Sequence, residues 1–135
     1  MSAWDSATLT DDAALTEYES SFPEAPKKIK GEGGKTAYDG KRELAKAKIG
    51  RWLVRRGFEL SGLTSPAQFA TAATLLELSL TYRDMAKRND AVSGQKAEYY
   101  EAEYIEEIEG LSFAYDAPAT TSQPFVRGTA TLWRS

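Results

Sequence analysis

Residues 65–90 read SPAQFATAATLLELSLTYRDMAKRND, and residues 93–111 read SGQKAEYYEAEYIEEIEGL. In both stretches apolar side chains recur at three- and four-residue spacing, which is typical of a helix that buries one face. The polar residues 89–94 interrupt this pattern, so they are expected to form a turn. The two stretches therefore predict two long helices joined by a short polar connection.

Local capping signals place the starts of these two helices. Ser65 is a good N-cap, Pro66 suits the first helical position, and Gln68 completes a capping-box pattern. Ser93 is the expected cap of the second helix. The first helix has an apolar stripe wide enough to pack on more than one neighbour. The stripe residues are Phe69, Ala72, Ala73, Leu75, Leu76, Leu80 and Tyr82 in the first helix, and Ala97, Tyr100, Tyr104, Ile108 and Leu111 in the second.

A third helix is expected upstream, from Asp39 or Gly40 to Arg56, with Gly57 as a left-handed stop. Its apolar positions fall on one face at helical spacing, whereas lysine and arginine occupy much of the remaining surface. The residues expected to face the core are Ala45, Ile49, Trp52 and Leu53.

The N-terminal residues 1–36 are expected to form a separate segment. Residues 1–9 are predicted to be loose, and Thr10 is the expected cap of a short helix that turns Leu15 and Tyr18 inward. The Lys/Gly-rich stretch KKIKGEGGKTAYDG that follows predicts a mobile basic loop. Residues 37–111 then form the predicted helical core.

The C-terminal residues 112–135 are expected to form an extended or β arm. The stretch PFVRGTATLWRS alternates with period two beyond an uncharged, turn-rich linker, but it is too short to form a sheet alone. We expect it to dock on a partner; the competing prediction is that it folds back as a hairpin with LSFAYD on its own bundle. The expected partner-binding residues are Phe125, Val126, Arg127, Leu132, Trp133 and Arg134.

The composition argues against several classes of enzyme. The chain has 135 residues and contains neither histidine nor cysteine. Catalysis by Ser–His–Asp or Cys–His groups and thiolate metal sites are therefore excluded within this chain. We expect no enzymatic activity and no cofactor. The sequence also lacks an apolar run long enough for a membrane span, so no membrane association is expected.

The charge distribution is strongly polarised, although the net charge is only −3. Residues 27–56, from Lys27 to Arg56, carry eleven Lys/Arg and three acids, a net +8. Residues 98–116 carry seven acids and no Lys/Arg, a net −7. These charges pair either inside one chain or between neighbouring copies. For the second case the expected interface residues are Lys48, Arg51 and Arg55 on one copy and Glu103, Glu106 and Glu107 on the next.

The charged segments have alternative interpretations. The glutamates of residues 98–109 are expected to form a solvated or partner-facing surface rather than a cation site, because hard-cation sites usually also take oxygens from loops. The basic segment is an alternative nucleic-acid interface that would neutralise phosphates without reading sequence.

The tyrosines at 82, 99, 100 and 104 are expected at the edge of the core, with wet hydroxyls, rather than around a ligand.

Residues 40–135 resemble the head–tail adaptor (connector) proteins of tailed bacteriophages. The resemblance rests on KRELAKAKIGRWLVRRG at 41–57, on the two helical stretches quoted first, and on the terminal TATLWRS. It implies a mainly α fold, a small antiparallel helical bundle with a C-terminal tail. The Lys/Gly-rich residues 27–36 have no counterpart in this pattern.

The resemblance also implies a function. Copies would form a homo-oligomeric ring, twelvefold in the family, beneath the portal protein of the filled capsid. The ring would extend the DNA channel without sequence-specific binding and support attachment of tail or neck proteins. The protein would then reside at the head–tail interface of the virion and in the host cytoplasm during assembly. The alternatives are a helical nucleic-acid-binding or regulatory domain that uses Lys27 to Arg56, and another phage neck or tail-completion protein.

Overall fold

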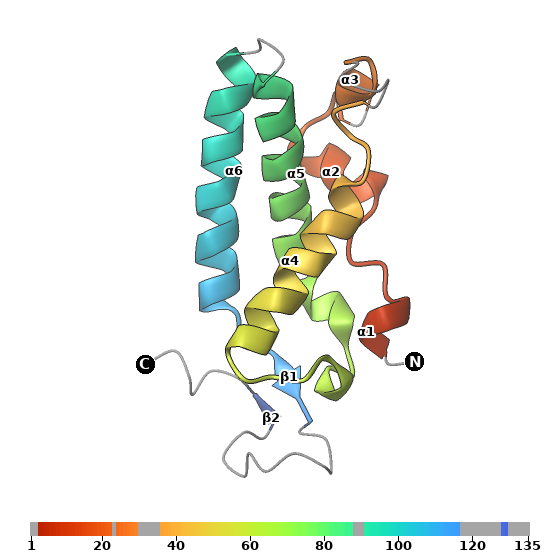
Figure 1. The fold of residues 1–135 in the computed structure, drawn as a ribbon, viewed down its shortest axis with the longest axis vertical. Helices are drawn as coiled ribbons and strands as arrows, with labels where there is room; N and C mark the ends of the chain where they lie inside the picture. The colour runs from red at the N-terminus through yellow and green to blue at the C-terminus, as the bar shows by residue number, and fades with distance from the viewer. Residues whose placement is uncertain (1–2, 23, 30–35, 88–90, 117–127, 130–135) are drawn as a thin grey trace.

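The computed structural model describes residues 3–22, 24–29, 36–87, 91–116 and 128–129. Its frame is three helices, α4 (Lys41–Arg55), α5 (Ala70–Ala86) and α6 (Ala91–Gly110). The three helices run in alternating directions, and α5 packs against both α4 and α6 (Figure 1). The prediction of a mainly α antiparallel bundle is therefore confirmed.

Helix α5 is the centre of the fold and is buried on most of its surface. Its wide apolar stripe packs toward α4 on one side and toward α6 on the other, as the sequence pattern predicts. One core cluster joins α5 to α4 and to the residues after α6; its members include Trp4, Ile49, Leu53, Phe69 and Phe113. A second cluster joins α5 to α6 and α2; its members include Leu15, Phe22, Leu78, Tyr82 and Tyr100.

Helix α4 follows the predicted pattern closely. Ala45, Ile49 and Leu53 are buried, and Trp52 packs at the edge of the first cluster. Gly57 has φ of 88°, in the left-handed region that glycine adopts without a steric penalty, which explains the end of the helix there.

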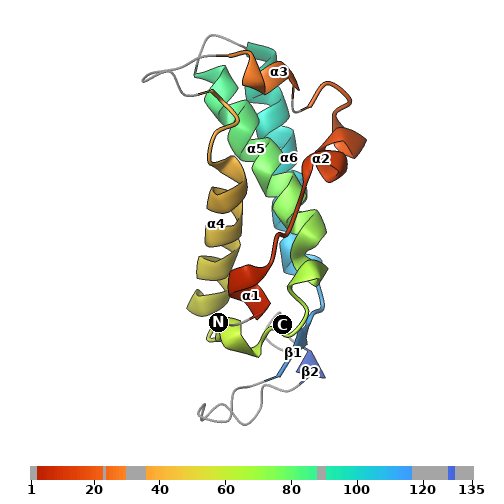
Figure 2. The same ribbon diagram turned by 90° about the vertical axis from the view of Figure 1, so that its right-hand side faces the viewer.

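The N-terminal segment lies along the bundle in three short helices, α1 (Ala3–Ser6), α2 (Asp12–Tyr18) and α3 (Glu24–Lys27) (Figure 2). The expectation that residues 1–9 are loose is wrong for the described part of that stretch. Trp4 and Leu9 are 4% and 5% exposed, and the Trp4 ring meets Phe69 edge-on at 5.9 Å between centroids. Burying a tryptophan is favourable enough to hold a chain end that lacks a long helix.

Two details of α2 also differ from the prediction. Asp11, not Thr10, is the N-cap, and its carboxylate accepts a hydrogen bond from the Ala14 N–H at 2.9 Å. Thr10 is buried instead, with its hydroxyl 2.7 Å from that of Thr74 on α5. Leu15 is buried as expected, but Tyr18 is 44% exposed.

The predicted caps of the two long helices are only partly right: Ser65 and Pro66 hold the expected cap and first positions, but those of a 3₁₀ turn that leads into α5. The chain enters α5 through a 3₁₀ turn, η3 (Pro66–Phe69), and Ser65 makes no capping hydrogen bond. The Gln68 amide instead donates to the Ala114 carbonyl at 3.1 Å and accepts from its N–H at 2.8 Å. Ser93 is buried within α6, which begins at Ala91.

After α6 the chain returns to the bundle. Strand β1 (Ala114–Tyr115) pairs antiparallel with β2 (Gly128–Thr129), with Ala114 opposite Thr129. The neighbouring Phe113 and Tyr115 rings are buried against Phe58, at 5.3 Å and 4.8 Å between centroids. This pairing is the one that the fold-back alternative predicts.

The β1 strand is also fixed to the turn before α5. The Asp116 N–H donates to the carbonyl of Gly62, in the 3₁₀ turn η2 (Leu60–Gly62), at 2.9 Å, and the Tyr115 hydroxyl accepts from the Glu59 N–H at 3.0 Å. The core thus continues beyond the predicted boundary at residue 111. The expected partner-binding residues Phe125, Val126, Arg127, Leu132, Trp133 and Arg134 lie outside the described residues.

Candidate protein-protein interface

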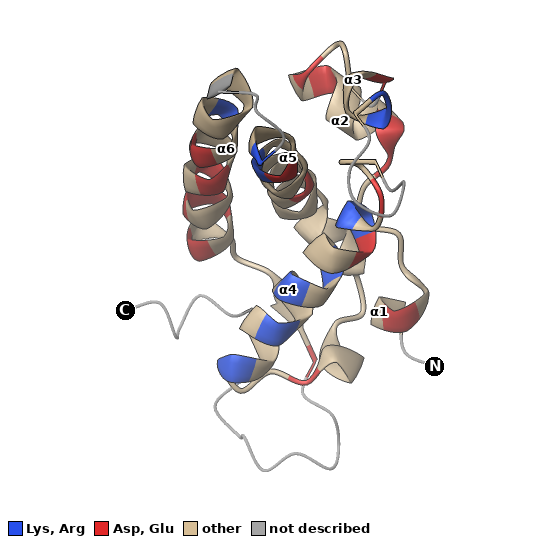
Figure 3. Ribbon diagram, turned by 45° about the horizontal axis from the view of Figure 1, so that its top comes forward, with Lys and Arg blue, Asp and Glu red and all other residues tan. Residues whose placement is uncertain are grey.

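The C-terminal half of α4 presents a basic face made of Lys48, Arg51 and Arg55. All three side chains are exposed. Their spacing of three and four residues places them along one side of the helix. Among the described residues none of the three forms an ion pair. Figure 3 shows the Lys and Arg positions along α4 and the Asp and Glu positions along α6.

The N-terminal half of α4 uses its cations inside the chain. Lys41 pairs with Asp84 at 3.6 Å, and Arg42 pairs with Asp12 and Glu77. Lys46 donates to the carbonyl of Ala7 at 2.7 Å and so holds the N-terminal segment. Pairing inside the chain therefore describes the N-terminal half of α4, and the exposed basic face lies in its C-terminal half.

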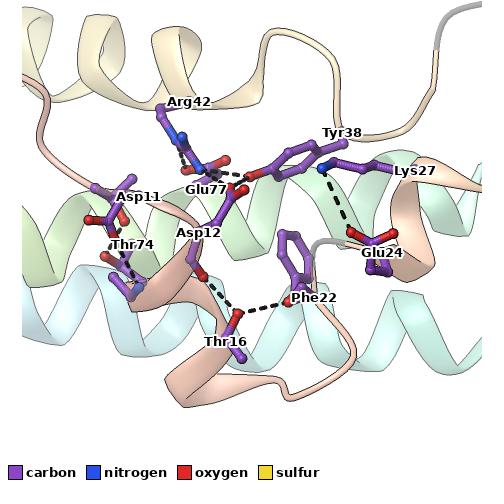
Figure 4. Close-up of polar contacts among 12 residues, drawn as sticks. Asp11, Asp12, Thr16, Phe22, Glu24, Lys27, Tyr38, Arg42, Thr74 and Glu77 are labelled. Atoms are coloured by element: carbon purple, nitrogen blue, oxygen red, sulfur yellow. Dashed lines mark hydrogen bonds and ion pairs between the residues drawn. The ribbon is translucent and has the colours of Figure 1, made fainter.

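The Arg42 cluster is the main polar link between α2, α4 and α5 (Figure 4). The Arg42 Nη2 atom donates to Asp12 at 2.7 Å and to the Tyr38 hydroxyl at 2.6 Å, and its Nε atom donates to Glu77 at 3.2 Å. The Tyr38 hydroxyl in turn donates to Asp12. The hydrogen bonds from Tyr38 and then from Arg42 lower the pKa of Asp12.

Glu77 is the most deeply buried acid of this cluster, with none of its surface exposed. Desolvation raises the pKa of Glu77, and the nearby Arg42 only partly opposes that rise. Within the described part of the chain, the second carboxylate oxygen of Glu77 and the hydroxyl of Thr81 have no hydrogen-bond partner. The fold tolerates this buried carboxylate only while Arg42 stays in place, because an unpaired buried charge is costly.

A second polar link holds the end of α2 on α5 and α6. Glu19 accepts hydrogen bonds from Tyr82 at 2.8 Å, Lys96 at 2.6 Å and Tyr100 at 2.7 Å. Desolvation raises the pKa of Glu19, but these three hydrogen bonds outweigh it and hold the pKa below its ordinary value. Together with the contacts of Lys46 and Thr10, the Arg42 and Glu19 clusters tie the N-terminal segment to the bundle.

An acidic pocket of about 410 Å³ lies between α2, α5 and α6. No lysine or arginine lines it. Three glutamates of α6 line it, together with tyrosines of α2 and α6. The lining residues that matter for its chemistry are Tyr18, Tyr99, Tyr100, Glu103, Glu106 and Glu107.

Two of the three tyrosines that line the pocket are open to solvent. Tyr99 is 59% exposed and Tyr18 is 44% exposed. The neighbouring Glu103 carboxylate raises the pKa of Tyr99, and both side chains line the pocket. Such large aromatic surfaces are typical of residues that a partner covers.

The structure gathers the predicted residues into two separate sets. Glu103, Glu106 and Glu107 share the acidic pocket, whereas the predicted basic residues share the basic face of α4. The prediction did not include Tyr18 and Tyr99 as pocket walls, although Tyr99 lies one helical turn before Glu103 and so was a usable signal.

The structure gives no sign of a metal site or a membrane span in its described part. No group of three or more acidic side chains there is placed to hold a metal ion. None of the described helices has the length and apolar character needed to cross a bilayer. Comparison with known proteins finds no matching family model, no matching curated protein and no matching solved structure.

Proposed function

We propose that this chain is a structural connector at a phage head–tail junction, where copies form a ring beneath the portal protein. The observation that carries the proposal is the placement of a basic face on α4 and an acidic pocket on α6, each without a cation–carboxylate partner in the described residues. Two complementary surfaces on different helices favour a head-to-tail contact, which closes into a ring when the rotation between copies allows it.

The fold supports the same proposal. An antiparallel bundle with an N-terminal segment tied down by the Arg42 and Glu19 clusters is a rigid unit, and rigid units assemble with little loss of conformational entropy. The resemblance of residues 40–135 to head–tail adaptors adds the location. The ring would extend the DNA channel, bind the portal and carry tail or neck proteins, with no catalytic role.

The test is charge reversal on the basic face. Lys48, Arg51 and Arg55 are changed to glutamate together, and particle size is measured by light scattering and electron microscopy, with and without purified portal. Rings should be lost at ordinary salt, while the helical circular dichroism is retained, because these exposed side chains make no ion pair in the described monomer. Normal rings from the variant would show that the basic face is not the contact between copies, and a parent that forms no ring with or without portal would refute the connector proposal.

A matched control reverses three exposed lysines outside the basic face, Lys27, Lys28 and Lys87. Because this control changes charge without touching α4, it should assemble as the parent does. Equal loss of rings in the control would show that overall charge, not the basic face, governs assembly.

A helical nucleic-acid-binding domain is the second candidate function, because the same exposed cations could meet phosphates. That function predicts DNA binding by the monomer whose affinity falls steeply with salt, by about 0.9 logarithmic units per tenfold salt for each neutralised phosphate. Trp52 is no free stacking residue, because it packs at the core edge with the Arg56 guanidinium 4.1 Å above its ring. Absence of salt-dependent DNA binding would remove this candidate.

A further inference from the structure

We propose that the acidic pocket is a socket for the basic face of a second copy of this chain, with Arg51 and Arg55 seated beside Glu103 and Glu107. This inference rests on the proposed function and adds to it the side chains that meet. It identifies the occupant of the pocket as two guanidinium groups from one helix.

The chemistry of the pocket fits a guanidinium better than any other group on the chain. Its carboxylates accept paired N–H donors, and its tyrosine faces attract a planar cation. An arginine side chain can use both the carboxylates and the tyrosine rings, because its guanidinium is charged and has a flat apolar face. The exposed ring of Tyr99 beside Glu103 offers both within one helical turn.

The spacing of the two surfaces matches. Arg51 and Arg55 are four residues apart on α4, which places them about 6 Å apart along the helix axis. Glu103 and Glu107 have the same separation on α6, again about 6 Å. Two helices laid side by side therefore bring both pairs into register at once.

The occupant must come from another molecule. Helix α5 packs against α4 and α6 (Figure 1). No ion pair among the described residues joins the basic face to the pocket. Because the socket and the basic face are on different helices, one copy can fill its neighbour's socket while its own stays open to the next copy. A contact of this kind repeats around a ring.

The experiment mixes two full-length variants that carry opposite reversals. The first is Arg51→Glu with Arg55→Glu, and the second is Glu103→Arg with Glu107→Arg. Self-association is measured by sedimentation up to about 1 mM, a concentration at which even weak contacts are populated. Each variant alone should associate at least about 100-fold more weakly than the parent, at about tenfold or more per reversed pair.

The mixture is the decisive arm. Every contact between unlike copies then joins an acidic α4 to a basic socket, or a basic α4 to an acidic socket, so mixed complexes should form where neither variant forms them alone. Recovery in the mixture also shows that both variants are folded. The matched control is Glu98→Arg with Glu109→Arg, which reverses two exposed acids of α6 outside the pocket and should associate as the parent does.

Several results would overturn the socket. These are a parent that stays monomeric at about 1 mM, a socket variant that associates normally, or a mixture that fails to associate. None of them removes the proposed function, because rings that form only on the portal, through other residues, would still be detected in the assembly assay with purified portal. Loss of rings on the portal in the parent itself would remove both.

Discussion

Replacing Arg42 with methionine tests how the N-terminal segment is held on the bundle. Methionine keeps an unbranched apolar stem but removes every hydrogen bond that the guanidinium donates to Asp12, Tyr38 and Glu77. The main consequence falls on Glu77, which stays wholly buried and loses its ion pair.

The size of the effect follows from the protonation of Glu77. A buried carboxylate without a partner takes up a proton, and for a group with an ordinary pKa of 4.5 this costs at most about 3.4 kcal/mol at pH 7, at about 1.36 kcal/mol per pH unit. Loss of the part-exposed bond to Asp12 adds about 1 kcal/mol. Since the Arg42 side chain is itself 32% exposed, we expect a loss of about 2–4 kcal/mol in the free energy of unfolding at pH 7.

The pH dependence gives the sign that identifies Glu77. Burial raises the pKa of Glu77, so the folded chain holds this proton more tightly than the unfolded chain, and stability declines as pH rises from 4.5 through the folded pKa. Removing Arg42 raises that pKa further. The deficit of the variant should therefore widen from pH 5 to pH 7, because protonation costs only about 0.7 kcal/mol at pH 5. Asp12 has a lowered pKa and acts only at lower pH.

The assay is urea unfolding followed by circular dichroism at both pH values. The control is Arg83→Met, which removes an exposed pair with Glu101 and should cost about 0–1 kcal/mol at either pH. Adding Glu77→Gln to Arg42→Met should remove most of the pH dependence. The reasoning fails if the Arg42→Met deficit is the same at both pH values or no larger than that of Arg83→Met.

Two further predictions concern the core and the C-terminal residues. Ile49→Ala and Leu76→Ala should each lower the free energy of unfolding by about 2–5 kcal/mol, because both side chains are buried; thermal unfolding equal to the parent in both would contradict the core assignment. Deleting residues 124–135 should leave a soluble, helical chain that no longer joins the portal or the ring. Normal assembly after the deletion would remove the docking role of these residues, and loss of helical structure would show that the fold needs the pairing of β1 with β2.

The long helices could be predicted because their signal is local. Residues such as Ile49, Leu53 and Leu76 repeat at helical spacing, and this repeat survives whatever the rest of the chain does. The same rule missed Trp4, because a single tryptophan in a short segment has no period. Its partner Phe69 lies far away in the sequence, so only the tertiary structure reveals the contact.

The errors in capping have one physical cause. Ser65 and Gln68 match a capping box, but Gln68 gains two hydrogen bonds to the backbone of Ala114 and leaves the cap unused. Thr10 likewise leaves the cap of α2 to Asp11 and bonds with Thr74 in the core. In both cases a partner far away in the sequence replaces the local one that a capping rule supposes, and the Thr10–Thr74 bond is buried as well.

The charged residues of the candidate interface could be predicted from the sequence, but their arrangement in space could not. Runs of like charge indicate exposed surfaces, which holds for Lys48, Arg51 and Arg55. The run could not show that Lys41 and Arg42 pair inside the chain instead, since this division depends on where the N-terminal segment and α5 meet the helix. The pocket walls depend on the same packing.

This division of the basic segment separates stability from assembly. The Arg42–Glu77 pair is part-buried, so salt screens it weakly, whereas the exposed cations of the basic face are fully subject to screening at a Debye length of about 8 Å in physiological salt. Under the proposed ring contact, changes of ionic strength should act on the contacts between copies while leaving the fold of each copy largely untouched. If every cation were paired inside the chain, no exposed cation would remain for salt to screen. If every cation were exposed, Glu77 would be buried and unpaired.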